Sequence, residues 1–174
     1  MINIIYSGLG NWIIVIPILS VILGCLFTES LKNIYHINMK VHLTKLKDKL
    51  QFEGINPSND TVSIGAAESV GGTGIGTRPM ELMLHAIAGC ASIDVCSILE
   101  KQRQVIKSYE VITQGKRVDG VPAYFETIHM EFVFTGDLDA KKVQRAVELS
   151  VEKYCSVAKT IDEKVKITYA YKIN

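Results

Sequence analysis

One long apolar segment constrains the fold of this chain more than any other feature. The segment from Pro79 to Lys101 contains no second proline, and Pro79 suits the first turn of a helix with Arg78 or Thr77 at its cap. The segment therefore predicts a helix of roughly 20 residues that is apolar around most of its circumference. Such a helix belongs at the centre of a domain or in an interface between two copies.

Shorter periodic segments on either side of this helix predict an α+β domain. Residues Phe125–Phe134 alternate between apolar and polar side chains, which is typical of a strand with one buried face. A second, amphipathic helix is expected over Asp139–Tyr154, with Val143, Val147, Ser150 or Val151, and Tyr154 facing inward. The other expected strands are Lys40–Leu46, Lys49–Ile55, Thr61–Gly65, Val105–Arg117 and Val165–Ile173, which gives the order βββ, α, ββ, α, β.

The charge and the cysteine content exclude several classes of protein. With 19 basic and 18 acidic side chains and a net charge of +1, the chain lacks the basic surface of a nucleic-acid-binding protein. Its four cysteines form neither the dense framework of a small secreted protein nor a zinc-binding spacing, so reduced thiols are expected. The four histidines also lack the spacing of metal ligands, and we expect neither a metal nor a cofactor.

The first 38 residues differ in character from the rest, which predicts a division into residues 1–38 and 39–174. No charged side chain occurs between Met1 and Thr28, and residues 9–27 are long and apolar enough to cross a bilayer. Two interpretations stay open: a membrane anchor that leaves the following domain in the cytoplasm, or translated upstream sequence before a true start at Met39. A cleaved secretory signal fits poorly, because the segment lacks a basic start and an Ala-x-Ala site.

Two cysteine motifs carry a resemblance to a known family. They are RPMELMLHAIAGCASIDV around Cys90 and VELSVEKYCSVA around Cys155, 65 positions later. Together they resemble the OsmC/Ohr family of osmotically inducible and organic hydroperoxide resistance proteins, and most closely its YhfA-like branch. The resemblance implies an α+β fold with antiparallel sheets around a long central helix. It also implies an intertwined homodimer with its active site at the subunit interface.

The resemblance also implies a chemistry for the two cysteines. Cys90 would attack an organic hydroperoxide and become a sulfenic acid, and Cys155 would resolve it by forming a disulfide. An external dithiol would then restore both thiols. Cys96 lies about 120° around the helix from Cys90 and is expected to point elsewhere and fill space.

Two further residues, Arg78 and Glu81, are candidates for the site. Active family members resemble one another in placing an arginine from the N-terminal sheet and a glutamate near the start of the helix beside the reactive thiol. Here residues 40–77 contain no arginine, and Met80 stands directly after the proline, where the family has its glutamate. Arg78 would therefore supply the cation from a new direction, with Glu81 one position later than in the family pattern.

Three functions remain open at this level. The first is thiol-dependent reduction of organic hydroperoxides. The second is a non-catalytic dimer that keeps both thiols and responds to redox state or binds a small hydrophobic ligand. In the third, the cysteines only fill a dimer core. The missing N-terminal arginine separates the first function from the second.

Overall fold

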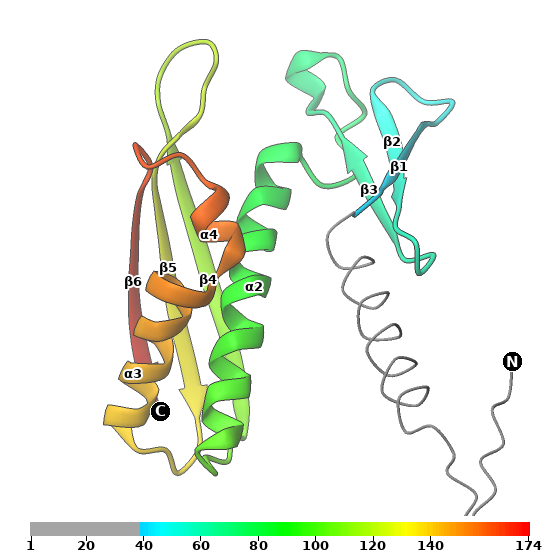
Figure 1. Cartoon of the computed structure of the whole chain (residues 1–174). Helices are drawn as coiled ribbons and strands as arrows, with labels where there is room; N and C mark the ends of the chain where they lie inside the picture. The colour runs from blue at the N-terminus through cyan, green and yellow to red at the C-terminus, as the bar shows by residue number, and fades with distance from the viewer. Residues whose placement is uncertain (1–38) are drawn as a thin grey trace, which may run out of the picture. The chain divides into compact units, whose positions relative to one another are not determined.

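The computed structural model describes residues 39–174, coloured in Figure 1. The apolar segment 9–27, interpreted either as a membrane anchor or as translated upstream sequence, lies outside the described residues. Most of the described chain, Leu43–Gly54 with Thr61–Asn174, belongs to one compact unit.

The N-terminal part of this chain forms a small sheet, as expected. Its strands are β1 (His42–Lys45), β2 (Gln51–Ile55) and β3 (Thr61–Gly65), paired in the order β1-β2-β3. Asn56 holds the β2–β3 turn, because its side-chain oxygen accepts hydrogen bonds from the backbone N–H groups of Ser58 and Asp60 at 2.9 Å each. A short 3₁₀ turn, η1 (Glu68–Val70), follows the sheet.

Helix α2 (Pro79–Lys101) has the predicted bounds, with Arg78 at its N-cap in extended conformation. Its buried residues recur every four positions and so form a single stripe along the helix. They are Ile87, Ala91, Val95 and Leu99. By length and composition alone, α2 would also pass for a membrane span, but it contacts α3 and β4 as the core helix of a domain does.

The second sheet consists of β4 (Ser108–Arg117), β5 (Phe125–Thr135) and β6 (Lys166–Ile173), in the order β4-β5-β6. Strands β4 and β5 pair antiparallel. Strands β5 and β6 pair parallel, so the expectation of purely antiparallel sheets is wrong for this sheet. The reason is the helical connection between β5 and β6, which carries the chain back along the sheet before β6 begins.

That connection is not the single helix that was expected over Asp139–Tyr154. Helix α3 (Ala140–Leu149) is capped by Asp139, whose carboxylate accepts a 2.8 Å hydrogen bond from the Lys141 N–H. The chain then widens into a π-helical turn over Ser150–Tyr154, hereafter the π-turn, and continues as the short helix α4 (Ser156–Thr160). Because of this widening, Tyr154 is 48% exposed instead of facing inward.

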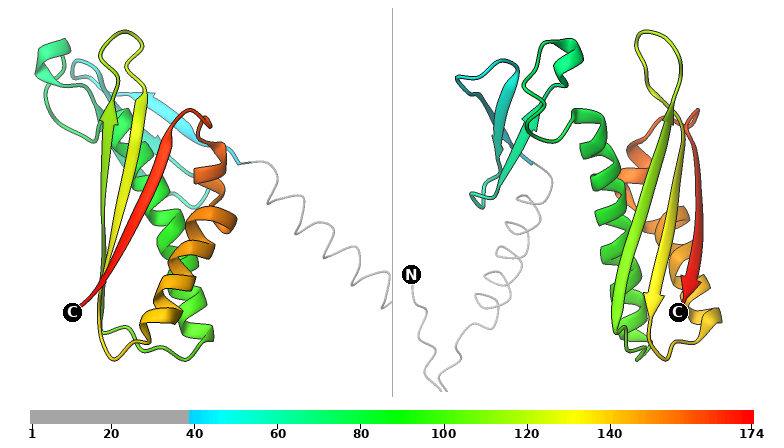
Figure 2. Two further views of the ribbon diagram at one scale, coloured as in Figure 1. Left: turned by 90° about the vertical axis from the view of Figure 1, so that its left-hand side faces the viewer. Right: turned by 180° about the vertical axis from the view of Figure 1, so that it is seen from behind.

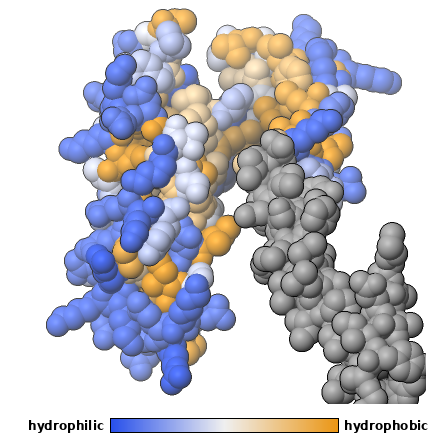
Figure 3. All heavy atoms as spheres, viewed as in Figure 1, coloured by the Kyte–Doolittle hydropathy of each residue, from blue (hydrophilic) through white to orange (hydrophobic). Residues whose placement is uncertain are grey.

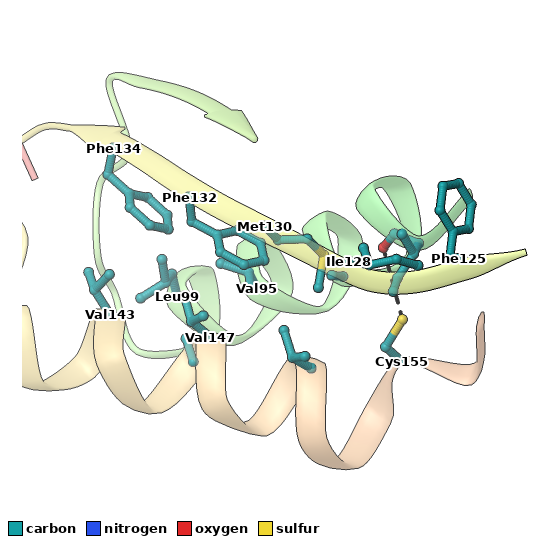
Figure 4. Packing of buried hydrophobic residues seen from close by; sticks show 14 residues of the cluster. Val95, Leu99, Phe125, Ile128, Met130, Phe132, Phe134, Val143, Val147 and Cys155 are labelled. Carbon is teal, nitrogen blue, oxygen red and sulfur yellow. Dashed lines mark hydrogen bonds between the residues drawn. The ribbon is translucent and has the colours of Figure 1, made fainter. Parts of the chain in front are cut away.

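The hydrophobic core lies between one face of the β4-β5-β6 sheet and the helices α2 and α3 (Figures 2 and 4). Strand β5 supplies alternate residues to it, as its sequence pattern predicted. These are Ile128, Met130, Phe132 and Phe134, all fully buried. Helix α3 adds Val143 and Val147, and Cys155 closes the end of the core nearest α4.

Candidate functional site

The two motif cysteines lie side by side. Cys90 is half-buried on α2, and Cys155 is completely buried at the N-cap of α4. The two thiols are close enough for Cys90 to contribute to the raised pKa of Cys155. The Cys155 sulfur also accepts a 3.4 Å hydrogen bond from the Ala158 N–H and donates a long, 4.0 Å one to the Ile87 carbonyl, drawn as the dashed line in Figure 4. The structure therefore brings together two thiols that are 65 positions apart in the sequence.

Burial gives these two thiols unequal properties. Burial, with a smaller contribution from the neighbouring Cys90, raises the pKa of Cys155 to about 11, although the hydrogen bond from the Ala158 N–H acts to lower it. Cys155 is therefore a protonated thiol at neutral pH, and it has no surface open to a substrate. Cys90 is the member of the pair that a molecule from solution can reach.

The π-turn holds Cys155 in this position. The buried Ser150 hydroxyl donates a 2.9 Å hydrogen bond to the Ala91 carbonyl on α2, and the Cys155 N–H donates one of 2.8 Å to the Ser150 carbonyl. On the outer side of the turn, which faces away from the cysteines, the Tyr169 hydroxyl of β6 donates a 2.6 Å hydrogen bond to the exposed Glu152. The sequence indicated an inward residue at position 150 or 151 but contained no signal for these hydrogen bonds.

Arg78 and Glu81 lie at the start of α2 and are engaged there. The Arg78 guanidinium donates hydrogen bonds to the carbonyls of Gly74, at 3.1 Å, and Gly76. The Glu81 carboxylate accepts a 2.9 Å hydrogen bond from the Arg78 N–H and so caps the helix. Within residues 39–174, none of the hydrogen bonds or ion pairs joins either side chain to Cys90.

Cys96 belongs to different surroundings, as its position on the helix predicted. It lies near Tyr109 of β4, and burial raises the pKa of the Cys96 thiol. The Tyr109 hydroxyl donates a 2.8 Å hydrogen bond to Ser92, which in turn donates to the Ala88 carbonyl at 2.6 Å. Cys96 therefore lies apart from the two motif cysteines, beside Tyr109.

A separate open cavity of about 240 Å³ lies between α2 and β4 and does not include either motif cysteine. It is lined by Glu81, Leu84, His85, Ala88, Val111 and Thr113. In the part of the chain that the structure describes, no group of three or more His, Cys, Asp or Glu side chains could hold a metal ion.

The comparisons with known proteins show the family to which the chain belongs. Residues 72–170 match the family described as OsmC-like protein, and this stretch contains α2 and both motif cysteines. Protein YhfA of Escherichia coli (strain K12) is 46% identical over 96 residues, which cover 55% of this chain and 72% of YhfA. The chain therefore belongs to the OsmC family.

Solved structures support the same fold. A crystal structure of a hypothetical protein from Aquifex aeolicus VF5 is similar with a TM-score of 0.66 and 31% identity, over 79% of this chain and 98% of that one. The organic hydroperoxide resistance protein OhrB of Bacillus subtilis is similar with a TM-score of 0.54 and 21% identity, over 78% of this chain and 98% of that one. The likeness to OhrB concerns the fold alone.

Proposed function

We propose that this protein reduces organic hydroperoxides, with Cys90 as the attacking thiol and Cys155 as the resolving thiol. The observation that carries the proposal is the contact between a reachable thiol and a buried one. A first thiol that is open to solvent and a second one enclosed beside it suit a two-step reaction. The names of solved relatives such as OhrB give the proposal its substrate class.

The proposed reaction has three steps. In the first, the Cys90 sulfur attacks the hydroperoxide, the O–O bond breaks, and an alcohol leaves as Cys90 becomes a sulfenic acid. In the second, the Cys155 sulfur attacks the Cys90 sulfur, and water leaves as the disulfide forms. In the third, an external dithiol reduces the disulfide and is itself oxidised to a disulfide.

The surroundings of Cys90 favour an apolar substrate. Met83 lies two helical turns before Cys90 on the same side of α2 and is 40% exposed, and no charged side chain lies between them in the sequence. An alkyl or aryl hydroperoxide gains by burying carbon against such a surface, whereas hydrogen peroxide does not. We therefore place organic hydroperoxides ahead of hydrogen peroxide as substrates.

Arg78 and Glu81 are included in the proposed site because of their position at the start of α2. Their hydrogen bonds hold the glycine-rich segment 71–76 against the N-terminal end of the helix. In this segment Gly74 and Gly76 adopt positive φ angles of 77° and 86°. Arg78 is the arginine nearest to Cys90 in the sequence and is our candidate for the cation that favours a thiolate.

We further propose that the protein works as a homodimer built on the uncovered side of α2. On this side Ala86, Gly89 and Ile93 are exposed, Ile93 by 73%, and a Cβ added at Gly89 would meet nothing within 4 Å. Hydrophobic residues (orange) also reach the surface over α2 in Figure 3. A second copy would cover this apolar surface, and a small residue at position 89 would let two helices approach closely.

Sedimentation equilibrium tests the dimer. The wild-type protein is expected to have twice the mass of one chain, and Ile93→Asp is expected to have the mass of one chain because it places a charge in the apolar contact. Val70→Asp serves as the control, because Val70 is 66% exposed but lies outside α2. A wild-type protein with the mass of one chain would contradict the proposal.

The domain is proposed to work in the cytoplasm, where a dithiol reductant is available. A membrane anchor through residues 9–27 remains a separate proposal. Fractionation of cells that express the full chain tests it, because an anchored protein stays with the membranes after a carbonate wash and an unanchored protein does not.

A second function is favoured by one observation, the engagement of Arg78 with the carbonyls of Gly74 and Gly76. If this guanidinium stays there, Cys90 lacks its activating cation, and the pair would act as a redox-responsive site or a small-ligand-binding dimer. The two functions differ in turnover: a sensor forms the disulfide once, whereas a peroxidase cycles.

Steady-state consumption of cumene hydroperoxide in the presence of a dithiol separates these functions. The wild-type protein and Cys96→Ser are expected to consume many equivalents, and Cys90→Ser none. In a separate reaction without the dithiol, Cys155→Ser is expected to consume about one equivalent and to stop as a sulfenic acid that dimedone traps. A wild-type protein that stops after one equivalent with dithiol present would support the redox-responsive function instead.

A further inference from the structure

Ser150 has an unusual position in the core. Among residues 39–174, Ser150 is the one polar residue whose side chain is fully buried. Its hydroxyl donates to the carbonyl of Ala91, the residue that follows Cys90 on α2. Its own carbonyl accepts from the N–H of Cys155. One residue is thus hydrogen-bonded to the immediate neighbour of one cysteine and to the backbone of the other.

Core stability alone does not call for a hydroxyl at this position. The Ala91 carbonyl lies inside α2, where a helical carbonyl already accepts from the N–H four residues later. A small apolar side chain would fill the same space without the cost of burying a polar group. The hydroxyl fixes the position of the π-turn along α2, because a hydrogen bond is directional, whereas apolar contacts allow the two elements to shift along each other.

The position of the π-turn matters because the turn carries Cys155. Ser150 is the first residue of the π-turn, and Cys155 follows its last residue. A widened helical turn has more than one way of packing against its neighbour, and a small shift of the turn would move the Cys155 sulfur away from Cys90. Disulfide bonds form only within a narrow range of Cβ separation.

We propose that Ser150 is a positioning residue for the cysteine pair: its hydroxyl on Ala91 and its carbonyl on Cys155 fix the position at which the two thiols meet. The inference deepens the proposed function and rests on it to the extent that the disulfide is an intermediate of that reaction. Its direct consequence is a high effective concentration of one thiol toward the other, which is measurable without any peroxide.

The test measures the equilibrium of the Cys90–Cys155 disulfide in the full-length protein against mixtures of reduced and oxidised glutathione. Each disulfide formed in this exchange releases two molecules of reduced glutathione for one oxidised molecule consumed. After acid quenching, alkylation and peptide mass spectrometry give the fraction of the Cys90–Cys155 bond. We expect Ser150→Ala to lower the effective concentration by about tenfold, the usual effect of losing one hydrogen bond in a buried site.

Two variants control this measurement. Tyr169→Phe removes one hydroxyl from the outer side of the same π-turn, where it bonds Glu152, and should leave the effective concentration within about twofold of wild type. Ser150→Thr keeps the hydroxyl and should retain more of the effective concentration than Ser150→Ala does. Circular dichroism and urea unfolding establish that each variant is folded at the temperature of the exchange.

The outcomes separate this inference from the proposed function. A tenfold loss in Ser150→Ala without cumene hydroperoxide turnover by the wild type would keep the positioning role and exclude the peroxidase. Turnover by the wild type with no change in Ser150→Ala would do the reverse. Equal losses in Ser150→Ala and Tyr169→Phe, or in Ser150→Ala and Ser150→Thr, would overturn the positioning role of the hydroxyl. Failure of the wild type to form the disulfide would overturn it as well.

Discussion

The two sides of α2 differ in what covers them, although both are apolar. One side, with Ile87, Ala91 and Val95, is completely buried against the rest of the chain. The other side exposes Ala86, Gly89 and Ile93. Cys90 is half-buried and so belongs fully to neither side.

This difference shows how one helix can serve two purposes. The buried side contributes to the folding of the single chain, while the exposed side is the surface on which we propose that a second copy packs. A half-buried thiol between them is held by the core yet open to solvent, which a reactive cysteine requires. Cys155 lies wholly inside the core and meets Cys90 at its boundary.

The largest expected effect comes from truncating the buried side. Ile87→Ala removes a fully enclosed side chain and should lower the free energy of unfolding by about 2–5 kcal/mol, measured by urea denaturation. This loss should not depend on protein concentration. By contrast, the cost of Ile93→Ala should grow with protein concentration, because only the proposed second copy covers that side chain. Equal, concentration-independent losses would remove the distinction between the two sides.

The buried thiol gives stability a dependence on alkaline pH. The folded-state pKa of Cys155 is about 11, above the ordinary value of 9.0, so the folded state holds the proton more tightly than the unfolded state. The contribution of this thiol to the free energy of unfolding is complete below pH 9 and is lost as the pH rises toward 11, with a loss on the order of 2 kcal/mol.

Urea denaturation of the reduced protein at a series of pH values checks this sign and range. Cys155→Ala provides the comparison, because both proteins share the alkaline titration of their tyrosines and lysines. The wild type should lose more stability than Cys155→Ala between pH 9 and 11. Parallel curves would mean that the Cys155 thiol is not held in its protonated form by the fold.

The smallest effect concerns the start of α2, away from both sides compared above. Glu81→Ala removes the acceptor for the Arg78 N–H and should cost about 1 kcal/mol, whereas Glu81→Gln keeps an acceptor and should cost less. Thermal unfolding of the two variants measures the difference. Equal costs would indicate that the carboxylate acts through its charge and not through the capping hydrogen bond.

The sequence predicted those elements whose pattern is long and regular. The bounds of α2 follow from Pro79 and from the long apolar run that no second proline interrupts. The buried face of β5 follows from periodicity, because side-chain spacing alone decides which residues of a strand share a face. The N-terminal strands were also expected, and the Asn56 side chain forms the turn between two of them.

Other features depend on contacts that local patterns do not contain. The parallel pairing of β6 with β5 depends on where the connection returns, and the strand sequence is compatible with either direction. The π-turn adds a widened turn without breaking the run of helix-forming residues, so the exposure of Tyr154 was not visible. The meeting of Cys90 and Cys155 was suggested only by the family resemblance, since nothing in the local sequence pairs positions so far apart.

Disulfide mapping tests the central claim most directly. The reduced protein is treated with one equivalent of cumene hydroperoxide, and its non-reduced peptides are analysed by mass spectrometry. We predict one dominant disulfide, between Cys90 and Cys155, that a dithiol reverses, with Cys96 still reduced. Two unmodified thiols at these positions, or a disulfide that joins Cys96 in place of Cys155, would contradict the account.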